Sequence, residues 1–277
     1  MDKFLYGCIY LSAAIAVSVL LMIICYVTVR GIGSVSLEFL TTVTSARKGT
    51  VGIAGNIVNT LYIIMITLVI ATPIGVGSAI YLNEYAKPGK IVRIIEFTTE
   101  TLSGIPSIIF GLFGSVFFGT TLKLGYSLLT GALTLSLMIL PLITRNTQEA
   151  LRTVPDSYRS GALGMGATKW HMIRTILLPS AMPGIITGVI LAIGRIVGES
   201  VALLFTAGSG YLLPKAGGWL SKILQPGGTL TIQLYLSSSK AEYNVAFGIA
   251  FVLLVIVLCI NFLTKYLAKR FDVTRMK

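Results

Sequence analysis

The sequence predicts an all-α integral membrane protein: six transmembrane helices forming one domain over residues 1–277, with a cytoplasmic helix-turn-helix loop at 145–181 between helices 4 and 5. Of the 277 residues, 55% are hydrophobic and only 12% are charged, and the mean hydropathy is +0.87. Such a chain has too few polar side chains to cover a soluble domain. A helix needs about 20 apolar residues to cross roughly 30 Å of hydrocarbon. Six runs of about that length occur, at residues 8–29, 57–81, 102–118, 127–144, 182–207 and 245–266.

The first run is expected to remain in the mature chain. It is longer than the apolar core of a signal peptide, and no small-residue cleavage site follows it. Lysine and arginine are retained in cytoplasmic loops, and the segments on the side of the N-terminus hold roughly twice as many as those on the other side. Both termini are therefore predicted to be cytoplasmic. This bias largely explains the net charge of +12, so that charge gives no reason to expect a nucleic-acid partner.

The third run begins with residues that interrupt helices, namely Gly104, Pro106 and Ser107. Proline removes a backbone donor, and glycine permits a bend or a close helix contact. Two interpretations are open. The segment is either a tight packing point or a hinge, or broken helix, beside a path through the bilayer. Glu96 and Glu100 precede it and are expected to be solvated charges at the start of a helix.

The fifth run contains two charged residues, Arg195 and Glu199, with Gly198 and Ser200 beside them. Their spacing of four residues allows an ion pair on one helix face. Ionisable residues within a span usually face a bundle interior or a water-filled path. Arginine suits an oxyanion because its planar guanidinium stays charged and can donate two parallel hydrogen bonds. We expect these four residues to line a substrate path, and the alternative is a packing seam that contains one buried ion pair.

The loop between the fourth and fifth runs is expected to hold two short helices. Pro155 and Asp156 favour a helix start, which predicts a helix from Asp156 to Leu163. Gly164 and Gly166 are expected to end it in the left-handed conformation. Thr168 can cap a second helix, which should stop or bend before Pro179. The alternative is an ordinary basic loop next to the membrane.

The segment 209–244, predicted to be extracytoplasmic, is ambiguous. Apolar and polar residues alternate from Leu230 to Leu236, as in a strand. A lone strand would leave its backbone groups unpaired at the membrane surface, so we favour a short interfacial helix.

Several sites are not found in the sequence. The only Gly-Lys pair, Gly89-Lys90, lacks the following Ser or Thr of a phosphate-binding loop, so the chain is not expected to bind ATP in that manner. No clustered Cys or His residues suggest a metal site. Cys8, Cys25 and Cys259 lie in or at the ends of spans and are interpreted as small apolar residues. Catalysis and a cofactor are not expected in this chain.

The loop resembles the coupling motif of ABC importer permeases, which has Glu-Ala-Ala, three residues, Gly, nine residues and Ile-x-Leu-Pro. Gly166 and Ile176-Leu-Leu-Pro179 match this pattern, whereas Ser160-Gly-Ala162 stands at the Glu-Ala-Ala position and agrees only at Ala162. The resemblance implies that the loop docks an ATPase. The implied coupling residues are Ser160, Gly161, Ala162, Gly164, Gly166, Ala167, Thr168, Ile176 and Pro179.

Four further motifs are similar to those of phosphate importer permeases of the PstA type, which have a MetI-like transmembrane domain. These are the segments 79–86, 104–111, 149–155 and 193–208. The resemblance implies a multi-pass subunit of the bacterial cytoplasmic membrane that forms half of a path for inorganic phosphate. The implied partners are a sibling permease of the PstC type, a cytoplasmic ATPase dimer that binds ATP and Mg, and an extracytoplasmic phosphate-binding protein. It also implies that the membrane Arg and Glu of the family correspond to Arg195 and Glu199.

Other functions remain open on the residues alone. One Arg and one Glu do not distinguish phosphate from another tetrahedral oxyanion. A gradient-driven carrier or channel could use the same pair, although carriers usually show two repeated halves and none is found here. A scaffold that only recruits a soluble partner is a further alternative.

Overall fold

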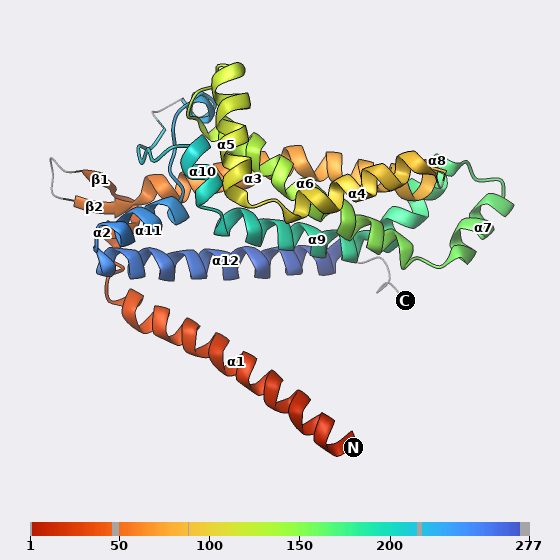
Figure 1. Ribbon diagram of the computed structural model, residues 1–277, viewed down its shortest axis with the longest axis horizontal. Coiled ribbons are helices and arrows are strands. Elements are labelled where there is room, and N and C mark those ends of the chain that lie inside the picture. The colour runs from red at the N-terminus through yellow and green to blue at the C-terminus, as the bar shows by residue number, and fades with distance from the viewer. Residues whose placement is uncertain (1, 46–49, 88, 215–217, 272–277) are drawn as a thin grey trace.

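The computed structural model describes residues 2–45, 50–87, 89–214 and 218–271, and it is almost entirely helical (Figure 1). Five helical stretches in this part of the chain are long and apolar enough to cross a membrane. A bent pair supplies a sixth. In chain order the major helices are α1 (Asp2–Ile32), α3 (Ala54–Ile80), α4 (Lys90–Gly104) with α5 (Ser107–Gly114), α6 (Leu128–Arg152), α9 (Leu178–Gly198) with α10 (Val201–Thr206), and α12 (Tyr243–Phe271).

The predicted all-α membrane class is thus confirmed, but two spans are broken. The third, expected over 102–118, consists of α4 and α5, whose axes differ by 100°, followed by the π turn η2 (Ser115–Thr121). The fifth, expected over 182–207, is interrupted between α9 and α10. Apolar composition predicts where a span lies but not whether its backbone is continuous.

The core lies where α3, α6 and α9 pack together. Its fully buried side chains include Leu135 and Ile139 of α6 and Ala192 of α9. Glycines let the helices approach closely, since a Cβ on Gly188 of α9 would lie 2.7 Å from the Cβ of Asn146 on α6. Small residues at helix contacts are typical of membrane bundles.

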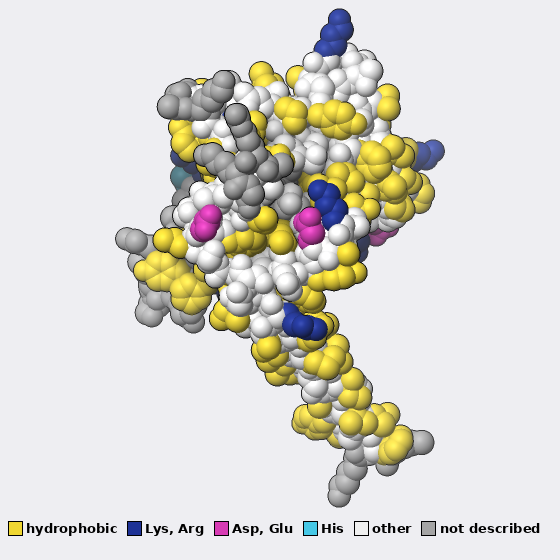
Figure 2. All heavy atoms as spheres, turned by 90° about the vertical axis from the view of Figure 1, so that its left-hand side faces the viewer, with side chains coloured by type: hydrophobic (Ala, Val, Ile, Leu, Met, Phe, Trp, Pro, Cys, Tyr) yellow, Lys and Arg dark blue, Asp and Glu magenta, His cyan; other side chains and the backbone are white. Residues whose placement is uncertain are grey.

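Helix α1 diverges from the bundle (Figure 1). Only its last turns meet α12, where the rings of Tyr26 and Phe247 lie edge to face with centroids 5.6 Å apart. A Cβ on Gly31 would collide with the carbonyl of Phe247, so this contact requires glycine. The rest of the helix projects outward and is covered with exposed hydrophobic side chains (Figure 2).

One end of the bundle holds the short elements α2 (Leu37–Thr41), the antiparallel hairpin β1 (Val43–Ser45) with β2 (Thr50–Ile53), η4 (Ser221–Leu224) and α11 (Leu230–Ser239) (Figure 1). The helix favoured over Leu230–Leu236 is therefore present, and Thr229 caps it by accepting from the backbone N–H of Ile232. Asn56 and Asn59 of α3 fasten this end, because their side-chain amides donate to the carbonyls of Gly228 and Gly210 at 2.9 and 3.0 Å.

The opposite end holds α7 (Asp156–Gly164) and α8 (Lys169–Met172), which lie between α6 and the π turn η3 (Ile173–Leu177). Helix α1 begins and α12 ends toward this end (Figure 1). The predicted cytoplasmic location of the termini, Met1 and 272–277, falls outside the described residues, and so do three basic residues of the segments predicted to lie on the other side of the membrane, Arg47, Lys48 and Lys215. The orientation of the chain stays a prediction.

Candidate functional site

The break in the fifth span is built around Glu199. Helix α9 ends at Gly198, and Glu199 is extended, with φ −81° and ψ 125°. Its Oε1 accepts the backbone N–H of Ala202 at 3.0 Å, while its carbonyl accepts the hydroxyl of Thr231 from α11 at 2.9 Å. A carboxylate that binds a free N–H in the first turn stabilises a helix start. Glu199 therefore fixes both the start of α10 and the position of the break.

The prediction that Arg195 and Glu199 form an ion pair is wrong. No ion pair joins these two side chains, both of which are described. Residues four apart face each other only on a continuous helix, and α9 ends at Gly198, before Glu199. The Glu199 carboxylate instead accepts a hydrogen bond from the Ala202 N–H. Arg195 lies exposed in the last turn of α9, where the helix dipole favours a cation. Gly198 is exposed beside it, and Ser200 is half-buried.

The break in the third span contains the residues expected at a hinge. Helix α4 ends at Gly104, and Pro106 holds an extended backbone before Ser107 begins α5. Proline forces the preceding residue out of the α region, which explains the ψ of 130° at Ile105. Nothing lies within 4 Å of a Cβ built on Gly104, so this glycine is not a tight packing point within the subunit.

The two breaks belong to neighbouring segments. A Cβ added to Gly111 of α5 would lie 2.9 Å from the Cα of Ala202 in α10, so the two short helices touch through their backbones. Interrupted helices at membrane depth are tolerated where they are buried in protein or line a water-filled cavity. In transporters they commonly form substrate sites. The neighbouring breaks are therefore the structural feature most suited to a path.

In the loop, α7 occupies the expected segment, and Thr168 caps α8 by accepting the His171 N–H at 3.3 Å. One detail of the prediction is wrong: Gly164 is the last residue of α7, and of the two glycines only Gly166 is left-handed, with φ +83°. The second helix was expected to stop or bend before Pro179. It does not stop there but continues into α9 through the π turn η3, where the Leu178 N–H bonds the Ile173 carbonyl, five residues back.

The predicted coupling residues divide into two groups. Ala162 is buried among Leu151, Met172 and Leu177, and Ala167, Ile176 and Pro179 are half-buried. The others are exposed and form a surface of small and polar groups, to which Met165 adds a methionine that is 85% exposed. These exposed coupling residues are Ser160, Gly161, Gly164, Gly166 and Thr168.

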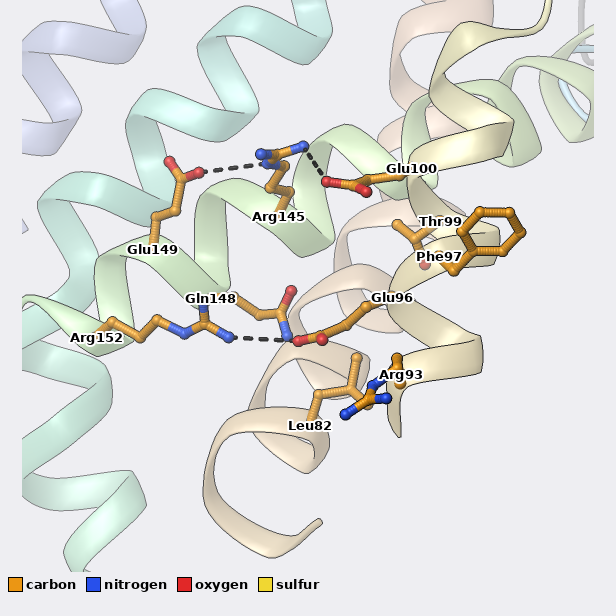
Figure 3. Close-up of a pocket in the computed structure, with 10 residues that line it drawn as sticks. All are labelled: Leu82, Arg93, Glu96, Phe97, Thr99, Glu100, Arg145, Gln148, Glu149 and Arg152. Carbon is orange, nitrogen blue, oxygen red and sulfur yellow. Dashed lines mark hydrogen bonds and ion pairs between the residues drawn. The ribbon is translucent and has the colours of Figure 1, made fainter. Parts of the chain in front are cut away.

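A charged cleft between α4 and α6 was missed by the sequence analysis (Figure 3). Its volume is about 360 Å³. The glutamates that were expected to be simply solvated form ion pairs with α6, Glu100 to Arg145 and Glu96 to Arg152, both at 3.4 Å. The sequence signal that could have indicated these pairs is the placement of Glu96 and Glu100 on one face of α4 and of Arg145 and Arg152, seven residues apart, on α6.

Two other features complete the cleft. Arg145 also contacts Glu149 on its own helix at 3.4 Å, and Arg93 lines the wall (Figure 3). Gln148 is 8% exposed, and its Nε2 has no partner within the described part of the chain. Because the ion-paired side chains are mostly exposed, each pair contributes only about 0–1 kcal/mol, so the cleft can open at little cost.

Lys222 is a buried lysine that the sequence analysis did not single out. It lies in η4 at the end opposite the loop and is 1% exposed. Its Nζ donates to the carbonyl of Pro226 at 3.3 Å, and no carboxylate pairs with it among the described residues. Desolvation by burial lowers the pKa of Lys222 from its ordinary 10.5.

Comparisons with known proteins agree with this architecture. The sequence profile of the family described as "Binding-protein-dependent transport system inner membrane component" matches residues 71–273. The protein named "Probable ABC transporter permease protein YqgI" from Bacillus subtilis (strain 168) is 41% identical over 75% of this chain and 70% of its own length. The phosphate transport system permease protein PstA of Haemophilus influenzae is 32% identical over 95% of this chain and 92% of its own.

Solved structures share the fold. A chain of a bacterial alginate ABC transporter in complex with an alginate pentasaccharide-bound periplasmic protein has a TM-score of 0.71 and 15% identity, covering 98% of this chain and 96% of that one. A chain of the MetNI methionine ABC transporter in an inward-facing conformation has a TM-score of 0.59 and 21% identity, covering 79% and 94%. At these identities the likeness establishes the fold and not the cargo.

Proposed function

The chain belongs to the family of binding-protein-dependent transport system inner membrane components, and we propose that it is the permease subunit of an ATP-driven importer of inorganic phosphate. It is an ABC transporter permease subunit. Phosphate as the cargo is supported by PstA relatives that match most of the chain, such as the Xylella fastidiosa (strain Temecula1) protein at 34% identity over 84% of it. The name of the Bacillus subtilis relative YqgI mentions no cargo.

The observation that carries the proposal is an exposed arginine beside a break in a membrane span. Arg195 has no ion-pair partner within the described residues, so its guanidinium is available to an anion. The guanidinium fork can donate two hydrogen bonds to a phosphate. Glu199, with Gly198 and Ser200, holds the irregular backbone next to it and would line the same path.

The loop supplies the connection to a motor. A cytoplasmic ATPase dimer would dock on the exposed coupling residues Ser160, Gly161, Gly164, Gly166 and Thr168, and it would bind ATP and Mg and hydrolyse the nucleotide. In this arrangement both termini are cytoplasmic. A sibling permease of the PstC type would complete the path, and an extracytoplasmic binding protein would deliver phosphate. The chain itself would hold no ATPase site.

Transport would proceed by alternating access. ATP binding would draw the docked loops together and turn the path outward, and hydrolysis would reset it. Weak ion pairs between α4 and α6 and the bend at Gly104–Pro106 suit this cycle, since α4 can move relative to α6 without breaking a strong contact.

The test is ATP-dependent uptake of labelled phosphate into liposomes that contain the assembled complex. Arg195→Gln should lower uptake by at least about tenfold, the effect of losing one charge-assisted contact of about 1.5–3 kcal/mol. Arg30→Gln is the matched control, because Arg30 is exposed near the end of α1, far from the break in sequence, with its guanidinium 5.8 Å from the ring centroid of Tyr26. Unchanged uptake in Arg195→Gln would show that this side chain does not contact the cargo.

Two further arms separate the alternatives. Excess sulfate should not compete with phosphate, and equal competition would indicate a permease for oxyanions in general. Uptake that persists without the ATPase and follows an ion gradient would indicate a carrier or channel.

A further inference from the structure

One arginine of the loop is bonded to two other elements at once. Arg159 of α7 contacts Glu84 in the π turn η1 (Tyr81–Tyr85), which continues α3 toward the loop. Its Nη2 lies 3.0 Å from Glu84 Oε1, and its Nε lies 3.2 Å from the same oxygen. The Glu84 side chain is only 5% exposed and that of Arg159 is 19% exposed. The pair is therefore largely shielded from water.

The same guanidinium also binds the C-terminal end of α6. Nη2 donates to the Leu151 carbonyl and Nη1 to the Val154 carbonyl, each at 2.9 Å. These carbonyls lie at a helix end, where intrahelical partners run out. Asn83 donates to Glu84 Oε1 at 2.7 Å and fixes the carboxylate. We call Arg159, Glu84, Leu151 and Val154 the Arg159 junction.

A second contact joins the loop to the same π turn. Lys169, the first residue of α8, places its Nζ 4.9 Å from the ring centroid of Tyr85. Both short helices of the loop thus reach η1, each through a charged side chain. Because α3 and η1 form one uninterrupted helical stretch from Ala54 to Tyr85, the loop is tied to a complete membrane span.

We propose that the Arg159 junction transmits the movement of the docked loop to α3, and that Glu84 and Arg159 are positioning residues for coupling between ATP hydrolysis and transport. This rests on the proposed function. A buried pair with several hydrogen bonds keeps its geometry under load, because separating it leaves an uncompensated charge. A lysine could not replace the arginine, since one ammonium does not present the planar fork that reaches a carboxylate and two carbonyls together.

The experiment measures the number of phosphate ions taken up per ATP hydrolysed by the complete complex in liposomes. Glu84→Gln keeps the shape but removes the charge, and it should lower this ratio by roughly tenfold, which corresponds to about 1.4 kcal/mol. Arg159→Lys should lower it as well. ATP hydrolysis and co-purification of the ATPase should stay close to wild type. The ratio does not depend on how much complex assembles, so a variant that assembles poorly still gives an answer.

Asp156→Asn is the matched control. Asp156 contacts the same arginine at 3.0 Å, but it lies on α7 itself, is 97% exposed and links no second element. Its ratio should remain that of the wild type. A wild-type ratio in Glu84→Gln would overturn the junction while leaving phosphate transport intact. A wild-type complex that takes up no phosphate would instead refute the proposed function.

Discussion

Glu199 has two possible roles in the fifth span: its carboxylate either caps α10 or supplies a negative charge as a counterion for Arg195. Substitution by Gln or Ala separates these two roles. If its carboxylate mainly caps α10, Glu199→Gln should be mild, because the amide oxygen can still accept the Ala202 N–H that lies 3.0 Å from Oε1. Replacing a charged acceptor with a neutral one costs about 1 kcal/mol, and removing the acceptor in Glu199→Ala costs about 2 kcal/mol. These values correspond to factors of about 5 and about 30 in the local equilibrium that holds the break.

The assay is phosphate uptake at saturating ATP, with the amount of assembled complex measured in parallel. We expect Gln to retain a substantial part of the wild-type rate and Ala to retain little. Glu242→Ala, at an exposed glutamate after α11, should change nothing and serves as the control. Equal and severe loss in Glu199→Gln and Glu199→Ala would refute the reasoning, since it would show that the negative charge itself is needed, as in a counterion for Arg195.

Two further predictions concern the loop and the buried lysine. Gly166→Val should weaken co-purification of the ATPase, because a φ of +83° costs a branched residue about 1–2 kcal/mol even though the surrounding space is open, whereas Gly7→Ala, also in open space but within α1 and outside the coupling residues, should not. Lys222→Met should raise the thermal midpoint of unfolding at pH 7. In wild type the lowered pKa of Lys222 means that the unfolded chain binds more protons, so stability should rise with pH up to about 10.5, and the variant should lack this rise.

The class of fold and the approximate spans follow from composition, because the bilayer imposes a length and an apolar content that the sequence displays directly. The two short helices of the loop could also be predicted from the sequence, since Thr168 and Gly166 act on the backbone next to them. The π turn η3, through which the helix continues into α9, could not be predicted from the sequence. It depends on the packing of η3 against Ala162 and Leu151, which is a tertiary contact.

The break at Glu199 and the charged cleft were missed for a related reason. A spacing of four predicts an ion pair only on a continuous helix, and one of the two contacts that hold Glu199 at the break comes from the hydroxyl of Thr231, some thirty residues further along the chain. The partners of Glu96 and Glu100 lie on α6, and sequence distance gives no indication of that pairing. Local capping is encoded near the residue, whereas ion pairs between helices are set by packing.

The strengths of the ion pairs indicate which parts of the subunit move together. The cleft pairs are 45–66% exposed and each is held by contacts at 3.4 Å, so water can replace them. The pair at the Arg159 junction is 5% and 19% exposed and carries backbone hydrogen bonds as well. A force applied to α7 should therefore carry α3 and the end of α6 as one body, while α4 separates from α6 at the cleft. Cross-linking α4 to α6 across the cleft should block transport, whereas cross-linking α7 to η1 should not.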